Sequence, residues 1–89
     1  MAKSLKHKVE KALKKAVGKK ADIRLEIVPA NKVGGIVLSA SFATESPSER
    51  QDRIWKSLDE HLTPLERTRV VFIVTDTPDE YEALKRAAG

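Results

Sequence analysis

The chain of 89 residues is 40% hydrophobic, has no cysteine and carries 17 basic against 13 acidic side chains, a net charge of +4. This length supports one modest hydrophobic core, and the lack of cysteine excludes a disulfide framework, a thiolate nucleophile and a cysteine-held metal cluster within the chain. The longest fully apolar run, residues 70–74, is far shorter than the ~20 residues that cross a bilayer, and the N-terminus lacks the apolar core of a signal peptide. We therefore expect a single cytoplasmic domain over residues 1–89 that does not associate with membranes.

The basic charge is concentrated at one end of the chain. Residues 1–20 carry eight lysines and one glutamate, a net charge of +7, whereas the remaining residues have a net charge of −3. Apolar residues recur there every three or four positions, which predicts an amphipathic helix over residues 3–17, with Ser4 as its N-cap and Gly18 as its stop. Its apolar stripe consists of Leu5, Val9, Ala12, Leu13, Ala16 and Val17.

A β-hairpin is predicted over residues 22–43. Apolar and charged residues alternate from residue 22, a pattern typical of a strand with one solvated face, and Pro29 ends this strand. Residues 30–35 include two glycines and supply the turn, and alternation resumes in a second strand with Val37 on its solvated face. The inward residues of the two strands are expected to include Ile23, Leu25, Ile27, Ile36 and Leu38.

Three helix starts share one pattern, a hydroxyl residue followed by proline and, two residues later, by glutamate. The pattern occurs at residues 46–49, 63–66 and 77–80, and it forms a capping box that satisfies unpaired backbone donors. It predicts helices over residues 47–62 and 78–88, with one short turn of helix between them. The apolar residues of the two longer helices are Ile54, Trp55, Leu58 and Leu62 in the first, and Tyr81 and Leu84 in the last.

The apolar run at residues 70–74 has no alternation, which predicts a strand over residues 69–75 that is covered on both faces and is therefore central. The crossover through residues 46–68 is long enough to return this strand parallel to its neighbour. The expected fold is α+β, in the order α-β-β-α-α-β-α, with helices packed on one face of a three-stranded mixed sheet. The predicted core consists of Ile23, Leu25, Ile27, Ile36, Leu38, Ile54, Leu58, Val71, Ile73 and Leu84.

Two runs carry a family resemblance: RQDRIWKSLDEHL at residues 50–62 and TDTPDEYEAL at residues 75–84. They resemble those of the BolA-like proteins, whose fold is related to the type II KH domain. The resemblance implies a monothiol glutaredoxin as partner, with an iron–sulfur cluster shared through a histidine at the end of the third strand. This chain has Arg50-Gln51 in place of the family's arginine-histidine pair, and Val74 in place of that strand-end histidine. Because valine cannot ligate iron, we expect no iron–sulfur ligation.

The sequence contains no catalytic or metal-ligating motif. His7 and His61 are the only imidazoles, and they lie on different predicted helices without a metal-ligand spacing. The KH loop that clamps RNA needs a GXXG, whereas residues 61–64 contain no glycine. Trp55 lies on an apolar stripe, which favours core packing over base stacking. We therefore expect no enzymatic activity, no cofactor, no metal and no small-molecule substrate.

Two functions remain open. The first is that of a regulator that binds DNA or RNA weakly and non-specifically through the lysines of the first helix, because their number exceeds what solubility and the helix dipole require. The alternative is a protein–protein adaptor, related to the BolA-like partners of glutaredoxins but without iron–sulfur ligation. Salt weakens phosphate contacts far more than an apolar protein interface, so salt dependence separates the two. The predicted nucleic-acid-binding residues are Lys3, Lys11, Lys14, Lys15, Lys19 and Lys20.

Overall fold

The computed structural model describes residues 2–88, so the two terminal residues of the predicted domain, 1 and 89, lie outside the described residues. The elements follow the predicted order, with one addition, the 3-10 helix η1. The first helix begins before Ser4, which is therefore not its N-cap. In chain order the elements are α1 (Ala2–Val17), β1 (Asp22–Val28), β2 (Lys32–Leu38), η1 (Ala40–Thr44), α2 (Pro47–His61), α3 (Pro64–Arg67), β3 (Val70–Asp76) and α4 (Pro78–Ala88).

The three strands form one mixed sheet in the order β1-β2-β3. β1 is antiparallel to β2 and β3 is parallel to β2, which confirms the predicted mixed sheet. The prediction that the third strand is central was wrong, because β2 occupies that position and β3 lies at an edge. The run 70–74 is apolar on both sides even though only one side is covered: Phe72 and Val74 remain 40% and 41% exposed.

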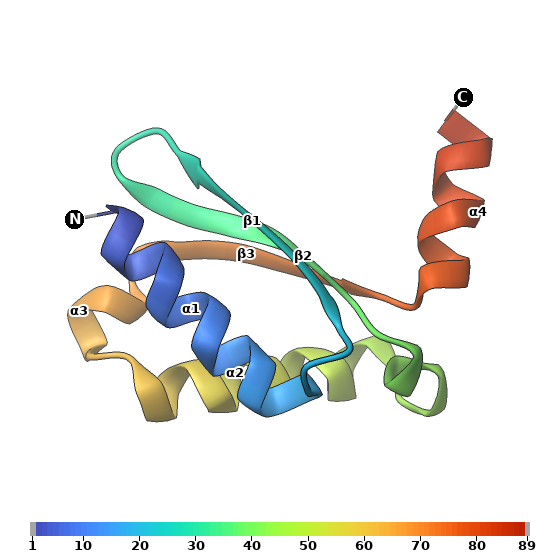
Figure 1. The fold of residues 1–89 in the computed structure, drawn as a ribbon, viewed down its shortest axis with the longest axis horizontal. Helices are drawn as coiled ribbons and strands as arrows, with labels where there is room; N and C mark the ends of the chain where they lie inside the picture. The colour runs from blue at the N-terminus through green and yellow to red at the C-terminus, as the bar shows by residue number, and fades with distance from the viewer. Residues whose placement is uncertain (1, 89) are drawn as a thin grey trace.

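The helices α1 and α2 lie together on one face of the sheet, and the opposite face is open (Figure 1). The helix α4 rises from the end of β3 and stands apart from the other helices (Figure 1). The core therefore lies between the sheet and the α1/α2 layer. Its buried residues are Leu5, Val9, Ala12, Leu13, Val33, Val37, Phe42, Ile54, Leu58, Leu62, Val70 and Ile73.

The inward face of β2 differs from the prediction. Val37 pairs with Ile23 and Val33 with Ile27 across the β1/β2 ladder, and directly opposite residues of such a ladder share one face. Both valines are fully buried against the helices, whereas Ile36 lies on the open face and is half-buried. The predicted phase of this strand was therefore wrong by one residue, which moves every side chain to the other face.

The cause of this error is the position of the turn. Ala30 and Asn31 adopt positive φ values of 69° and 56°, so the chain reverses there and β2 begins at Lys32. Gly34 and Gly35 were predicted to lie in the turn, but they lie within β2. At Gly34 the missing Cβ leaves room for the ring of a neighbouring phenylalanine on β3, and at Gly35 it leaves room for the main chain of β1.

The predicted second strand also ends early. β2 stops at Leu38, and the chain continues as η1, whose N-cap is Ser39. The Ser39 hydroxyl accepts a hydrogen bond from Ser41 N, and this turn inserts Phe42 fully into the core. The strand predicted up to residue 43 is thus replaced by a helical turn that still buries its aromatic residue.

Three residues of the predicted core are exposed. Ile27 at the end of β1 is 45% exposed, Val71 lies at an irregularity in the β2/β3 register, and Leu84 on α4 is 59% exposed. The prediction for Leu84 was wrong because Leu84 lies on the exposed side of α4. The half-buried Tyr81 is the residue of α4 that approaches the sheet, and its ring lies 5.4 Å from the guanidinium carbon of Arg24.

Arg50 connects α4 to the rest of the molecule. Its side chain is 5% exposed, and its Nε donates to the carbonyl oxygens of Phe42 and Glu45 at 3.0 and 3.1 Å. One terminal nitrogen donates to Thr75 O at 3.2 Å and to the Glu80 carboxylate at 2.7 Å. A single guanidinium therefore joins η1, α2, β3 and α4.

We expect α4 to loosen in acid. Hydrogen bonds from Arg50, and next the N–H of Thr77, lower the pKa of Glu80 from 4.5 to about 2. Because the pKa is lowered, ionised Glu80 stabilises the folded state through these hydrogen bonds. This stabilisation is fully present above pH 4.5 and is lost as the pH falls toward 2. In an NMR titration, the chemical shifts of the Glu80 carboxyl and of the α4 amides should change together in that interval. In the Glu80→Gln variant, the α4 amides should not show this transition. Ordinary titration of Glu80 near pH 4.5 with unmoved α4 amides would contradict the expectation.

Candidate functional site

The position of α1 is fixed by its apolar stripe. Leu5, Val9 and Leu13 are buried in the core beneath the sheet. The Ser57 hydroxyl of α2 donates to Ala12 O at 2.7 Å, which ties the two helices together at a buried point. Because one face of α1 is held in this way, the residues on its other face point to solvent.

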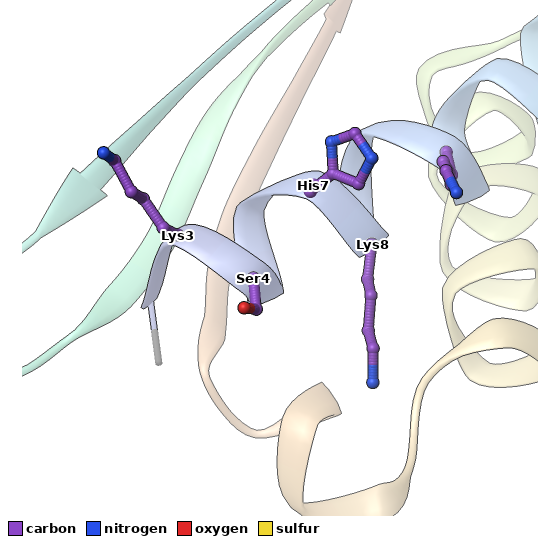
Figure 2. Close-up of a pocket in the computed structure, with 5 residues that line it drawn as sticks. Lys3, Ser4, His7 and Lys8 are labelled. Atoms are coloured by element: carbon purple, nitrogen blue, oxygen red, sulfur yellow. The ribbon is translucent and has the colours of Figure 1, made fainter.

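The outer face of α1 is basic. Lys3, His7 and Lys11 follow one another at intervals of four residues, so they form a row along the helix, and all three are exposed. Figure 2 shows Lys3 and His7 on one side of α1 and Lys8 pointing toward α3 on the other. A shallow groove of about 550 Å³ follows this face, lined by Lys3, Ser4, His7, Lys8 and Lys11.

One lysine of α1 has an acidic partner. Lys8 Nζ lies 2.6 Å from the carboxylate of Glu66 on α3, and the Glu66 side chain is largely buried. The hydrogen bond from Lys8, together with the N–H of Thr63, lowers the pKa of Glu66. Lys8 therefore fastens α1 to α3, and its charge is partly neutralised within the protein.

The six predicted site residues are all exposed. Lys3 and Lys11 both line the groove, Lys14 and Lys15 occupy the last turn of α1, and Lys19 and Lys20 follow the helix. Within residues 2–88, none of the six forms an ion pair.

The helix ends at Gly18, whose φ of +89° turns the chain away from the helical path. This places the two lysines that follow it beyond the helix end. The prediction omitted His7, although its spacing of four residues from Lys3 and from Lys11 indicates that it shares their row.

The described part of the chain contains no cluster of side chains suited to a metal ion. His7 and His61 are exposed on separate helices, and no group of three histidine or acidic residues there is placed to hold a metal ion. Trp55 packs against the core, as predicted; Arg67 covers its ring at 4.0 Å and its Nε1 donates to Gln51. None of the described helices is both long enough and apolar enough to cross a membrane.

A second surface lies on the open face of the sheet. Val74, which the family resemblance aligns with a histidine, is exposed there. Gln51, which the resemblance also aligns with a histidine, lies on α2 at the covered side of β3 and donates to Ile73 O at 2.8 Å and to Thr75 Oγ1 at 3.1 Å. A small groove of about 300 Å³ on this face is lined by Arg24, Leu25, Glu26, Gly35, Ile36, Phe72 and Val74.

Comparison with known proteins gives a structural neighbour. No family model matches the sequence, and no curated protein matches it. Among solved structures, the chain is similar to the crystal structure of a bol-like protein from Babesia bovis, with 16% sequence identity and a TM-score of 0.63. The match covers 90% of this chain and 92% of that chain. The four helices and the mixed three-stranded sheet of this protein therefore form a BolA-like fold.

Proposed function

We propose that this protein is a non-enzymatic BolA-like binding domain and a regulator that contacts nucleic-acid phosphates through α1 and the turn after it. The observation that carries the proposal is a set of exposed lysines without acidic partners among the described residues, on the outer face of a firmly packed helix and in the turn after it. We call this surface the basic face; it consists of Lys3, Lys11, Lys14, Lys15, Lys19 and Lys20.

The chemistry of the basic face favours backbone contacts over base recognition. Lysine ammonium groups neutralise phosphates and release counterions, whatever the sequence of the nucleic acid. α1 carries no phenylalanine, tyrosine or tryptophan that could stack on a base, and Trp55 is covered by Arg67. Binding to DNA or RNA is therefore expected to be weak and non-specific.

Charge reversal on the basic face is expected to abolish this binding. Lys11, Lys14 and Lys15 are exposed and lie off the buried stripe, so Lys11→Glu/Lys14→Glu/Lys15→Glu should keep the fold. If four lysines contact phosphates, the log–log plot of duplex affinity against salt should have a slope of roughly −3.6 for the wild type. Fluorescence anisotropy with a labelled duplex, over a salt series at low ionic strength, measures both quantities.

The matched control carries the same change in net charge elsewhere. Lys32, Lys56 and Lys85 are exposed on β2, α2 and α4, so reversing these three should leave much of the binding intact. Equal binding by the α1 triple variant and the wild type, or no salt-sensitive binding at all, would overturn the proposal.

In that event the adaptor function is favoured, because Phe72 and Val74 expose apolar surface on the open face of the sheet. An NMR titration with a monothiol glutaredoxin tests it directly. Shifts confined to the open face, and insensitive to salt, would assign the protein to this second class.

A further inference from the structure

The two edges of the sheet differ, and the edge at β3 is closed. Asp76 O accepts a hydrogen bond from the residue that follows β2, and successive carbonyls of a strand point to opposite sides, so Thr75 O and Ile73 O point outward. Both outward carbonyls are occupied by α2: Arg50 donates to Thr75 O at 3.2 Å, and Gln51 to Ile73 O at 2.8 Å. These side chains prevent another strand from pairing with β3.

The edge at β1 has no such cover. Across the described part of the chain, the main chain of β1 pairs with β2 along its whole length, and no side chain bonds to its other edge. The N–H and C=O groups of alternate residues of β1 point away from β2, and they form a template to which a second strand can add. β1 is therefore the edge of the sheet at which a further strand can add.

The sequence of β1 is complementary to itself. When two copies of β1 are placed antiparallel about Leu25, Arg24 of each copy stands opposite Glu26 of the other. The same register places Ile23 opposite Ile27 on the helix side of the sheet. Directly opposite charges attract and directly opposite apolar side chains pack, so both faces of this strand favour the same pairing.

Two features of the single chain also fit this register. Ile27 is 45% exposed although it points to the helix side of the sheet, and Glu26 forms no ion pair within residues 2–88. Arg24 forms an ion pair with Asp22 of its own strand, at 2.8 Å, and lies 5.4 Å from the Tyr81 ring; the Arg24 and Asp22 side chains are about half exposed. A second copy would cover Ile27 and would offer Arg24 a partner across the strands.

We propose that two copies of this protein associate by antiparallel pairing of their β1 strands. The two-fold axis then runs perpendicular to the sheet, which gives a continuous six-stranded sheet with both α1 helices on the same side. One strand pair buries little area, so the dimer is weak and forms at high micromolar to millimolar concentration. The association does not depend on nucleic-acid binding.

A charge-swap experiment tests this pairing. Sedimentation over a concentration series should show dimers for the wild type, and association about tenfold weaker or weaker still for Arg24→Glu and for Glu26→Arg, because each variant opposes like charges twice. An equimolar mixture of the two variants should restore association, since every cross-strand pair is then opposite in charge. The double variant Arg24→Glu/Glu26→Arg should also associate with itself.

The mixture also controls for folding, because misfolded chains would not regain a dimer on mixing. Lys56→Glu, on the exposed surface of α2, is the matched control and should dimerise like the wild type. A wild type that stays monomeric throughout the series, single variants that associate undiminished, or a mixture that fails to associate would each overturn the proposed β1 pairing.

Discussion

Leu58→Ala is expected to lower the free energy of unfolding by about 2 to 5 kcal/mol, the largest effect of any substitution considered for this chain. Leu58 is fully buried where α2 meets the core, so truncation removes apolar contacts and leaves a cavity that tightly packed neighbours cannot refill. Urea unfolding followed by circular dichroism measures the change.

The same substitution at an exposed leucine provides the control. Leu84, 59% exposed on α4, should lose no more than about 0.5 kcal/mol on truncation. This pair of variants also tests the difference between the sequence pattern, which treats both leucines as core, and the structure. An equal loss at both positions would mean that Leu84 is buried, which would contradict its exposed position on α4.

Gly35→Ala is expected to destabilise the protein by about 1 to 3 kcal/mol, while the neighbouring Gly34→Ala has a smaller effect. A Cβ at Gly35 would overlap the carbonyl oxygen of Arg24 and the Leu25 main chain, so the β1/β2 pair must move apart. A Cβ at Gly34 would meet only the ring of Phe72, which lies on the open face and can swing into solvent.

Urea midpoints of the two glycine variants give the comparison, and amide shifts of β1 show whether the strand has moved. Similar midpoints for both variants would indicate that the hairpin accommodates a methyl group on either face. That result would contradict the tight approach of β1 to Gly35 in the structure.

Features encoded by neighbouring residues were predictable from the sequence. The Ser46 hydroxyl accepts from Glu49 N at 3.2 Å, while the Glu49 carboxylate accepts from Ser46 N at 2.8 Å, as the capping pattern predicts. The same reciprocal bonds join Thr63 with Glu66. These contacts span only three residues, so the starting points of α2 and α3 can be predicted from local sequence.

Features that depend on distant neighbours were not predictable. An apolar run does not show whether a second layer covers it, so the edge position of β3 became apparent only from the strand order. The β2 phase was wrong because the glycines of that strand are also turn residues, and their function is to admit Phe72 and β1.

The candidate site shows the same division. Helical periodicity predicted that the lysines of α1 point to solvent, because apolar and basic residues recur with the helical period and so lie on opposite sides of one helix. The pairing of Lys8 with Glu66 joins residues far apart in the sequence, so no local pattern announces it. The basic face was therefore predictable as an exposed surface, but the ion pair of the neighbouring Lys8 was not.

The parallel pairing of β2 with β3 sets the order in which the molecule assembles. β1 and β2 are joined by a short turn and meet quickly, whereas β3 reaches β2 only after the intervening η1, α2 and α3 have been brought back across the sheet. Closing that long loop loses chain entropy before any contact compensates for it, which makes non-local strand pairs slow to form. We therefore expect the docking of β3 to limit the rate of folding, with the bonds from Arg50 and Gln51 to its outward carbonyls forming only after β3 has docked.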